Sequence, residues 1–266
     1  MHSLEGGAFF LYIRFMRNKQ KKELAVCGIA AVKSLAKNHP ERINRFYYNA
    51  GNMHVFGELC QFLSKNKRPY NMVKDEELEK LCGSVHHQGA VAMIDYPEII
   101  PLNKKTANTW AENKEAAVIL DSVGNANNFG AIVRSAVFFG IRNIVLPFEE
   151  ANSMITTSSY RVAQGGMDFI KINAINSIPN YLKDVKGKIV SIGTDLKANA
   201  SIKELPNLVA DKSFVVVLGN EENGISEAVS AACDYRLIIP GNFTEIQSLN
   251  VAQAASIIFY AAGLNK

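Results

Sequence analysis

The sequence has 266 residues, of which 48% are hydrophobic and 20% charged, and its formal net charge is +4. A chain of this length and composition can bury one large core or two smaller ones, which excludes a globally disordered protein. No apolar run reaches the roughly 18 residues of a membrane-spanning helix, and the apolar segment 8–13 lacks the features of a signal peptide, so we expect a cytoplasmic protein.

The excess of positive charge lies entirely in the first 100 residues, which contain 14 Lys and Arg against 10 Asp and Glu. A polyanionic partner and a solvated basic face without a partner both account for this bias. Four scattered cysteines, Cys27, Cys60, Cys82 and Cys233, show no zinc-like spacing. We therefore expect free thiols in a reducing compartment and no metal site.

The first part of the chain predicts a small α/β domain. Residues 1–21 fit poorly with the pattern that follows and are predicted to be an N-terminal extension. Residues 22–96 form the predicted domain, with strands expected at 24–29, 43–48 and 90–94 and helices at 30–37, 55–66 and 75–81. The polar stretch that follows contains two prolines, which predicts a linker over residues 97–115.

The second part, residues 116–266, alternates predicted strands with predicted helices. We expect strands at 116–120, 141–146, 169–171, 188–192, 214–218 and 236–239, and helices at 128–139, 158–164, 178–182 and 249–262. Residues 214–218 are consecutive apolar β-formers, as in a parallel strand that is buried on both faces. The alternation predicts an α/β fold with a mostly parallel sheet that is covered by helices on both sides.

Polar residues and glycines follow three of these strands, in segments 128–134, 218–224 and 239–250. Since open α/β sheets bind ligands at the carboxyl ends of their strands, we expect the three segments to meet. Each segment also has an ordinary structural explanation. Asn127 or Asn128 can cap one helix, Ser248 can cap another, and Gly219 with Gly224 can form a turn.

Taken together and in this order, the three segments resemble the SpoU (TrmH-like) class of SPOUT RNA 2′-O-ribose methyltransferases. Residues 24–32 and 83–92 are similar to the small L30e-like RNA substrate-binding domain that precedes the catalytic domain in several of these enzymes. The resemblance implies a C-terminal trefoil knot, a homodimer and S-adenosylmethionine as cofactor. The implied reaction is methylation of a ribose 2′-hydroxyl of RNA, either 23S-type ribosomal RNA or transfer RNA, and the first domain favours ribosomal RNA.

The resemblance also implies site residues. The catalytic set is Arg134, Asn128, Glu221, Ser248 and Asn250. The cofactor-binding set is Thr194, Gly219, Ile239 and Leu249. Because a guanidinium is a poor base, we expect Arg134 to bind the adjacent phosphate and to orient the hydroxyl.

The sequence departs from the family at the third segment. The family commonly has Ile-Pro-Met with a glycine two residues later, whereas this chain has Gly241 after Ile239-Pro240 and a loop, 241–247, that is one residue longer. An inactive RNA-binding or ribosome-assembly protein with the same fold is therefore an alternative. A nucleotide- or NAD-binding enzyme is a second alternative, although neither half has a G-x-G-x-x-G turn or a P-loop. We expect His87 and Gln88 to structure a turn rather than to contact RNA.

Overall fold

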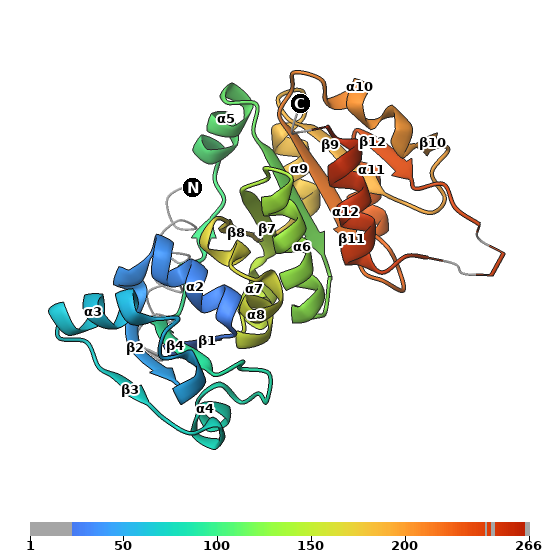
Figure 1. The fold of residues 1–266 in the computed structure, drawn as a ribbon. Coiled ribbons are helices and arrows are strands. Elements are labelled where there is room, and N and C mark those ends of the chain that lie inside the picture. Colours follow the sequence, from blue (N-terminus) through green and yellow to red (C-terminus); the bar gives the residue numbers. More distant parts are fainter. Residues whose placement is uncertain (1–22, 243, 246–247, 264–266) are drawn as a thin grey trace. The chain divides into compact units, whose positions relative to one another are not determined.

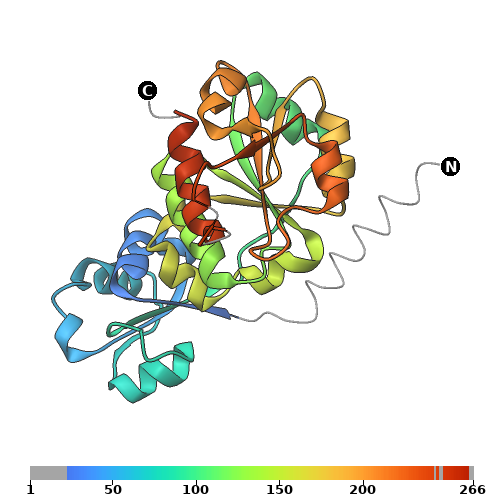
Figure 2. The ribbon, with the colours of Figure 1, turned by 90° about the vertical axis from the view of Figure 1, so that its right-hand side faces the viewer.

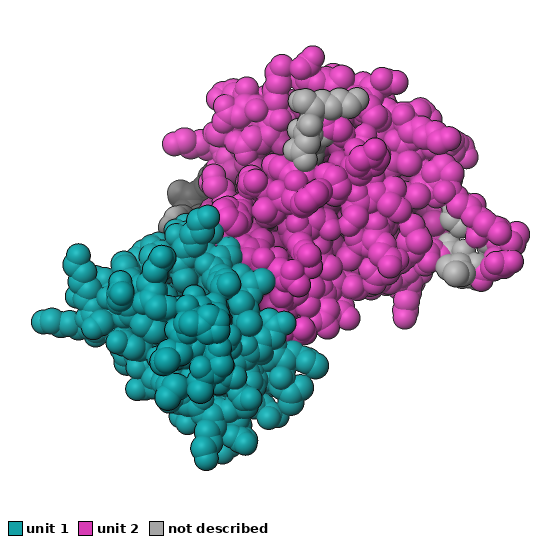
Figure 3. All heavy atoms as spheres, in the orientation of Figure 1, with its two compact units in different colours: residues 1–97 teal, residues 98–266 magenta. Residues whose placement is uncertain are grey.

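The computed structural model describes residues 23–242, 244–245 and 248–263. The chain divides into two compact units, residues 1–97 and 98–266, which Figure 3 distinguishes by colour. The expected N-terminal extension, residues 1–21, lies outside the described residues.

The first unit contains a four-stranded sheet in the order β1-β4-β2-β3 (Figure 1). Strand β4 is antiparallel to β1 and β2, and β3 is parallel to β2. The strands are β1 (Glu23–Cys27), β2 (Ile43–Tyr48), β3 (Tyr70–Met72) and β4 (Ala90–Asp95), and the helices are α2 (Ile29–Asn38), α3 (Gly57–Lys65) and α4 (Asp75–Cys82). Residues Leu24–Cys27 of β1 are all buried, because α2 and α4 both pack against β1 and β4.

The turn that leads into β4 is held by its own side chains. Nδ1 of the buried His87 accepts a hydrogen bond from the Gly89 N–H at 2.9 Å, and Oε1 of Gln88 accepts one from the Ile29 N–H at 3.0 Å. A Cβ on Gly89 would lie 2.3 Å from Asn52 Nδ2, and φ of Gly89 is +76°, so the turn requires glycine there. The expectation that His87 and Gln88 structure the turn is confirmed.

The second unit contains an eight-stranded sheet, ordered β10-β12-β9-β11-β6-β7-β8-β5, in which every neighbouring pair is parallel. The strands are β5 (Ile100–Pro101), β6 (Ala116–Asp121), β7 (Asn143–Pro147), β8 (Lys171–Ile175), β9 (Val190–Thr194), β10 (Ala200–Ser201), β11 (Phe214–Gly219) and β12 (Tyr235–Ile238). The helices are α5 (Lys104–Glu112), α6 (Ala126–Phe138), α7 (Phe148–Met154), α8 (Thr157–Ala163), α9 (Ile178–Val185), α10 (Leu205–Val209), α11 (Glu227–Ala232) and α12 (Val251–Ala261). The expected α/β fold with a mostly parallel sheet is confirmed.

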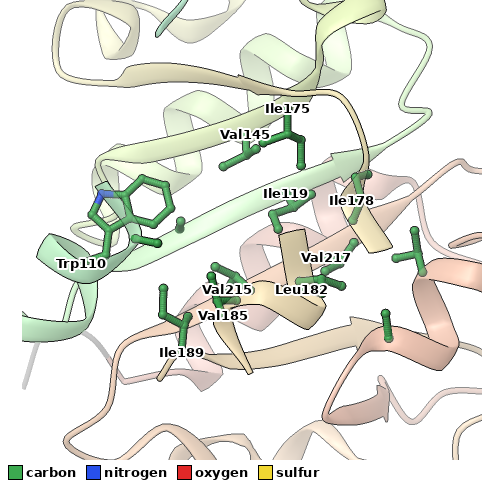
Figure 4. Packing of buried hydrophobic residues seen from close by; sticks show 14 of the residues in the cluster. Trp110, Ile119, Val145, Ile175, Ile178, Leu182, Val185, Ile189, Val215 and Val217 are labelled. Atoms are coloured by element: carbon green, nitrogen blue, oxygen red, sulfur yellow. The ribbon is translucent and has the colours of Figure 1, made fainter. Parts of the chain in front are cut away.

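Helices cover both faces of this sheet. On one face, Val215 and Val217 of β11 pack with Leu182 of α9 and Trp110 of α5 (Figure 4). On the other face, α6 and α12 pack against each other and α12 contacts β11 (Figure 2). The central strands β6 and β11 are therefore buried on both sides, as their uninterrupted apolar sequences predict. Within the described residues, no helix is long and apolar enough to cross a membrane.

Several elements differ from expectation, among them β5, α5 and β8. Residues 97–115, expected as a linker, contain β5, which pairs with β8, and α5, which Asn103 caps by accepting the Thr106 N–H. Only two side chains of the nine-residue α5, Ala107 and Trp110, are buried. The sequence of α5 is therefore mostly polar, which is why it was expected to be a linker. The strand expected at 169–171 lies instead at Lys171–Ile175. Strand order alone does not define a knot, so the trefoil knot stays a prediction.

Candidate functional site

The candidate site lies at the carboxyl edge of the parallel sheet, where β6 and β11 end side by side. Asp121 at the end of β6 is in register with Gly219 at the end of β11. In the strand order, β7 and β8 follow β6 in one direction along the sheet. Strands β9, β12 and β10 follow β11 in the opposite direction. This edge is therefore the point at which strand order reverses, and ligands bind at such points in open α/β sheets.

The first segment places Asn128 in the opening turn of α6. The cap of this helix is Asn125, whose Oδ1 accepts the Asn127 N–H at 2.8 Å, so the expected capping by Asn127 or Asn128 is wrong. Since Asn128 does not cap, both ends of its amide reach other segments. Its Nδ2 donates to Oε1 of Glu221, and its Oδ1 accepts from Nδ2 of Asn250 at 3.1 Å.

The second segment is a tight loop that presents Glu221. The backbones of Asn220 and Gly224 exchange hydrogen bonds at 3.1 and 2.9 Å, and Asn220 Oδ1 accepts the Glu222 N–H at 2.9 Å. A Cβ on Gly219 would lie only 2.1 Å from the carbonyl carbon of Gly224. Glycine at 219 therefore lets the two ends of the loop touch, and this closure holds Glu221 beside Asn128.

The third segment leads into α12, which is capped by Asn250 and not by Ser248 as expected. Oδ1 of Asn250 accepts the Ala252 N–H at 2.9 Å while its Nδ2 donates to Asn128. One side chain thus begins the helix and joins it to α6. Ser248 is exposed and makes no side-chain hydrogen bond to another described residue.

Arg134 is exposed on α6, and among the described residues it has no hydrogen-bond or ion-pair partner for its guanidinium. Helix α8 packs so closely on α6 that a Cβ on Gly130 would lie 2.5 Å from the Ser159 carbonyl oxygen. At Gly130 the backbone of α8 therefore approaches the backbone of α6 closely. The structure joins Asn128, Glu221 and Asn250 by hydrogen bonds, and it leaves Arg134 and Ser248 outside that network.

Three of the four expected cofactor residues share the same edge of the sheet. Thr194, Gly219 and Ile239 end, or directly follow, the adjacent strands β9, β11 and β12. The Thr194 hydroxyl donates to the Val217 carbonyl at 3.2 Å, so it ties β9 to β11. Leu249 is 45% exposed beside Asn250. This edge therefore offers backbone groups and apolar side chains to a ligand.

Three residues that the sequence reasoning missed also shape this edge. They are Asn125, Asn220 and Asp121. The Nδ2 of Asn220 donates to the Ser122 carbonyl at 3.0 Å. The Oδ2 of Asp121 accepts the Ser226 N–H at 2.8 Å. A sequence signal existed for Asn220, since Asn directly after a strand and four residues before Gly favours an Asx turn. Among the described residues, no group of three or more His, Cys, Asp or Glu could hold a metal ion.

Glu150 of α7 lies near the same edge in an unfavourable environment. Burial raises the pKa of its carboxyl above the ordinary 4.5, and the nearby carboxylates of Asp121 and Glu149 raise the pKa further, whereas a hydrogen bond with Ser122 lowers it. Among the described residues, the buried Oε2 of Glu150 has no hydrogen-bond partner. The ionised side chain is therefore less stable in the folded protein than in water.

We predict that Glu150→Gln stabilises the protein at pH 7.5. A carboxyl whose pKa is raised on folding contributes its full stability below its unfolded pKa, and that contribution is lost as the pH rises through the folded pKa. The variant should melt at a higher temperature than the wild type at pH 7.5, and the difference should vanish near pH 4. Glu149→Gln, at an exposed neighbour, is the matched control, and an equal gain in both variants would contradict the prediction.

Comparison with known proteins adds to this geometry. Residues 115–260 match the model described as the SpoU rRNA Methylase family, and residues 25–99 match the one described as RNA 2'-O ribose methyltransferase substrate binding. A 23S rRNA (guanosine-2'-O-)-methyltransferase, RlmB, of Acinetobacter baylyi is 29% identical over 247 residues, covering 88% of this chain and 94% of that protein. An uncharacterized tRNA/rRNA methyltransferase of Haemophilus influenzae is 29% identical over 171 residues, covering 64% of this chain and 48% of that protein. The structure of an rRNA methyltransferase from Sinorhizobium meliloti superposes with a TM-score of 0.70 at 18% identity, covering 91% of this chain and 87% of that one, which shows a shared fold.

Proposed function

Because the chain belongs to the SpoU rRNA methylase family, we propose that it transfers a methyl group from S-adenosylmethionine to a ribose 2′-hydroxyl of RNA. The observation that carries the proposal is the hydrogen-bonded link from Glu221 through Asn128 to Asn250. It joins the start of α6 to two segments that lie 93 and 122 positions further along the chain, at the edge where such sheets bind ligands.

The residues at this edge fit S-adenosylmethionine. We assign its binding to the strand ends at Thr194, Gly219 and Ile239 and to the exposed side chain of Leu249, which can cover an adenine ring. The bound cofactor supplies an electrophilic methyl group on a sulfonium sulfur. The closed loop after Gly219 keeps the backbone of this edge rigid, which favours a ligand held largely by backbone groups.

Arg134 serves to position the RNA. Its exposed guanidinium can bind the phosphate next to the target ribose through two parallel hydrogen bonds and hold the hydroxyl in line with the methyl group. Asn128, Glu221 and Asn250 keep α6, the β11 loop and α12 in register around that hydroxyl. Ser248, exposed just before Asn250, completes the proposed set.

The RNA, the location and the assembly state are also part of the proposal. The named activity of the Acinetobacter relative supports 23S ribosomal RNA over transfer RNA, and that substrate implies a cytoplasmic protein. We also propose a homodimer that forms through α6 and α12. Phe138 and Tyr260 on these helices are each 76% exposed, and the Tyr260 ring contacts Phe139, so this face carries an aromatic patch that a second copy can cover.

The test is a map of 2′-O-methylated riboses in ribosomal and transfer RNA from cells with and without the gene. Loss of one site, restored by the wild-type gene, would establish the activity and identify the substrate together. An unchanged map, combined with RNA binding by the purified protein, would favour an inactive RNA-binding or ribosome-assembly protein instead.

A further inference from the structure

The first unit carries a concentration of positive charge at the edge of its sheet where β2 and β3 begin. Five cations make up this amino-edge patch: Lys37, Arg42, Lys65, Lys67 and Arg68. Lys37 lies in the last turn of α2, Arg42 ends the 3-10 turn that precedes β2, and the other three span the end of α3 and the connection to β3 (Figure 1).

Hydrogen bonds show that the stretch leading into β2 and the stretch leading into β3 lie side by side. Nη1 of Arg68 donates to the carbonyl oxygens of Glu41 and Ile43, both at 2.6 Å. The Phe46 N–H donates to the Pro69 carbonyl at 3.1 Å, which fixes the same turn against β2. Residues that are about 25 positions apart in the sequence therefore share one surface, and the rigid backbone beneath it holds the cations together.

The charges of this unit are segregated. Residues 23–97 contain nine Lys and Arg against eight Asp and Glu, so the unit is nearly neutral overall, yet five of its nine cations lie in the patch. The single acid within residues 35–45 and 63–70 is Glu41, which pairs with His39 at 3.4 Å. The opening turn of α4, in contrast, contains three acids in succession, Asp75, Glu76 and Glu77.

The amino-edge patch suits a polyanion. Lys37, Lys65 and Lys67 are exposed, and the flexible ammonium groups of lysines bind phosphates as point charges. The turn at the opposite edge is less suited, because His87 and Gln88 use their side chains to hold the turn itself. The field of the segregated charges would also orient an approaching polyanion toward the patch.

We propose that the amino-edge patch binds the phosphate backbone of the RNA substrate and thereby supplies affinity that does not depend on base sequence. This inference rests on the proposed function, since it assigns to the first unit the task of holding the RNA that the second unit modifies. Phosphate contacts of this kind fix the position of a nucleic acid, and their contribution falls as salt is added.

The test compares two double variants that remove the same charge. The patch variant, Lys65→Gln with Lys67→Gln, removes two positive charges from the amino-edge patch. The α4 variant, Lys74→Gln with Lys80→Gln, removes two exposed lysines, one just before α4 and one in its last turn. The probe is 23S ribosomal RNA transcribed in vitro, and its affinity is measured over a range of KCl concentrations. We expect the patch variant to bind about tenfold more weakly, with a salt slope smaller by about 1.5, and the α4 variant to bind nearly as the wild type does. Equal affinities and slopes for the two variants would overturn the proposal.

A second readout separates this inference from the proposed function. With methyl transfer as the assay, the patch variant should raise KM for RNA and leave kcat at saturating RNA unchanged, with S-adenosylmethionine affinity unaltered. A lowered kcat at an unchanged KM would overturn the patch and leave the enzyme in place. If the wild-type protein methylates no RNA, the proposed function fails, and the binding comparison still decides whether the patch holds RNA.

Discussion

Replacing Arg134 by alanine should abolish detectable methyl transfer while the fold and the affinity for S-adenosylmethionine remain. The guanidinium is exposed and without a partner among the described residues, so its removal costs the fold little. The reaction, however, loses the group that orients the ribose, and loss of such positioning lowers turnover by about 100-fold or more. The measurement is single-turnover methyl transfer at saturating cofactor, together with a thermal melt.

Two further variants sharpen this result. Arg134→Lys keeps the charge but not the planar fork of donors, so we expect it to recover only a small part of the lost rate. Lys186→Ala removes an exposed cation at the end of α9, on the opposite face of the sheet, and should retain wild-type turnover. Full activity of Arg134→Lys would refute the two-pronged phosphate contact.

The substitution Gly219→Ala should destabilise the protein and disrupt the candidate site. In Gly219→Ala, the new Cβ would lie 2.1 Å from the Gly224 carbonyl carbon and 2.2 Å from the Ile225 nitrogen, and these backbone atoms cannot move aside cheaply. We expect the variant to lose about 3 kcal/mol of unfolding free energy, as overpacked cores do, and to lose cofactor binding because the loop with Glu221 reopens. Chemical denaturation and calorimetric titration with S-adenosylmethionine measure the two effects.

Gly124→Ala is the matched control for this prediction. It makes the same substitution in the loop after β6, where a Cβ would meet no atom within 4 Å. It should change stability by no more than about 0.5 kcal/mol, the usual range at unconstrained surface positions. If both alanine variants unfold at the same denaturant concentration, the contact between Gly219 and the Gly224 backbone does not constrain the loop.

Local pattern in the sequence was enough to predict most strands and helices of this chain. The run Phe214–Leu218 identified the central strand because burial on both faces requires uninterrupted apolar residues. Gly140 and Gly263 lie just after α6 and α12 and have positive φ there, as glycine after a helix end commonly does. Such features depend on neighbours in the sequence, and for that reason they can be read from it.

The capping residues were mispredicted because distant contacts decide them. Asn125, Asn127 and Asn128 are equally suitable caps by residue type, and Asn128 is withdrawn from that role by bonds to Glu221 and Asn250, which lie 93 and 122 positions away. Ser248 was preferred over Asn250 on the same local grounds. Rules that consider only neighbouring residues cannot predict these long-range hydrogen bonds. The position of the three segments after parallel strands did predict that the segments meet.

The link between Asn128 and Asn250 has a consequence for the timing of activity during synthesis. A ribosome makes the residues of β6 and α6 long before those of α12, and Asn250 can reach Asn128 only after the start of α12 has left the exit tunnel. The nascent chain therefore lacks a finished site until α12 docks. A chain cut short before residue 250 lacks the link between Asn128 and Asn250 and should therefore show no methyl transfer.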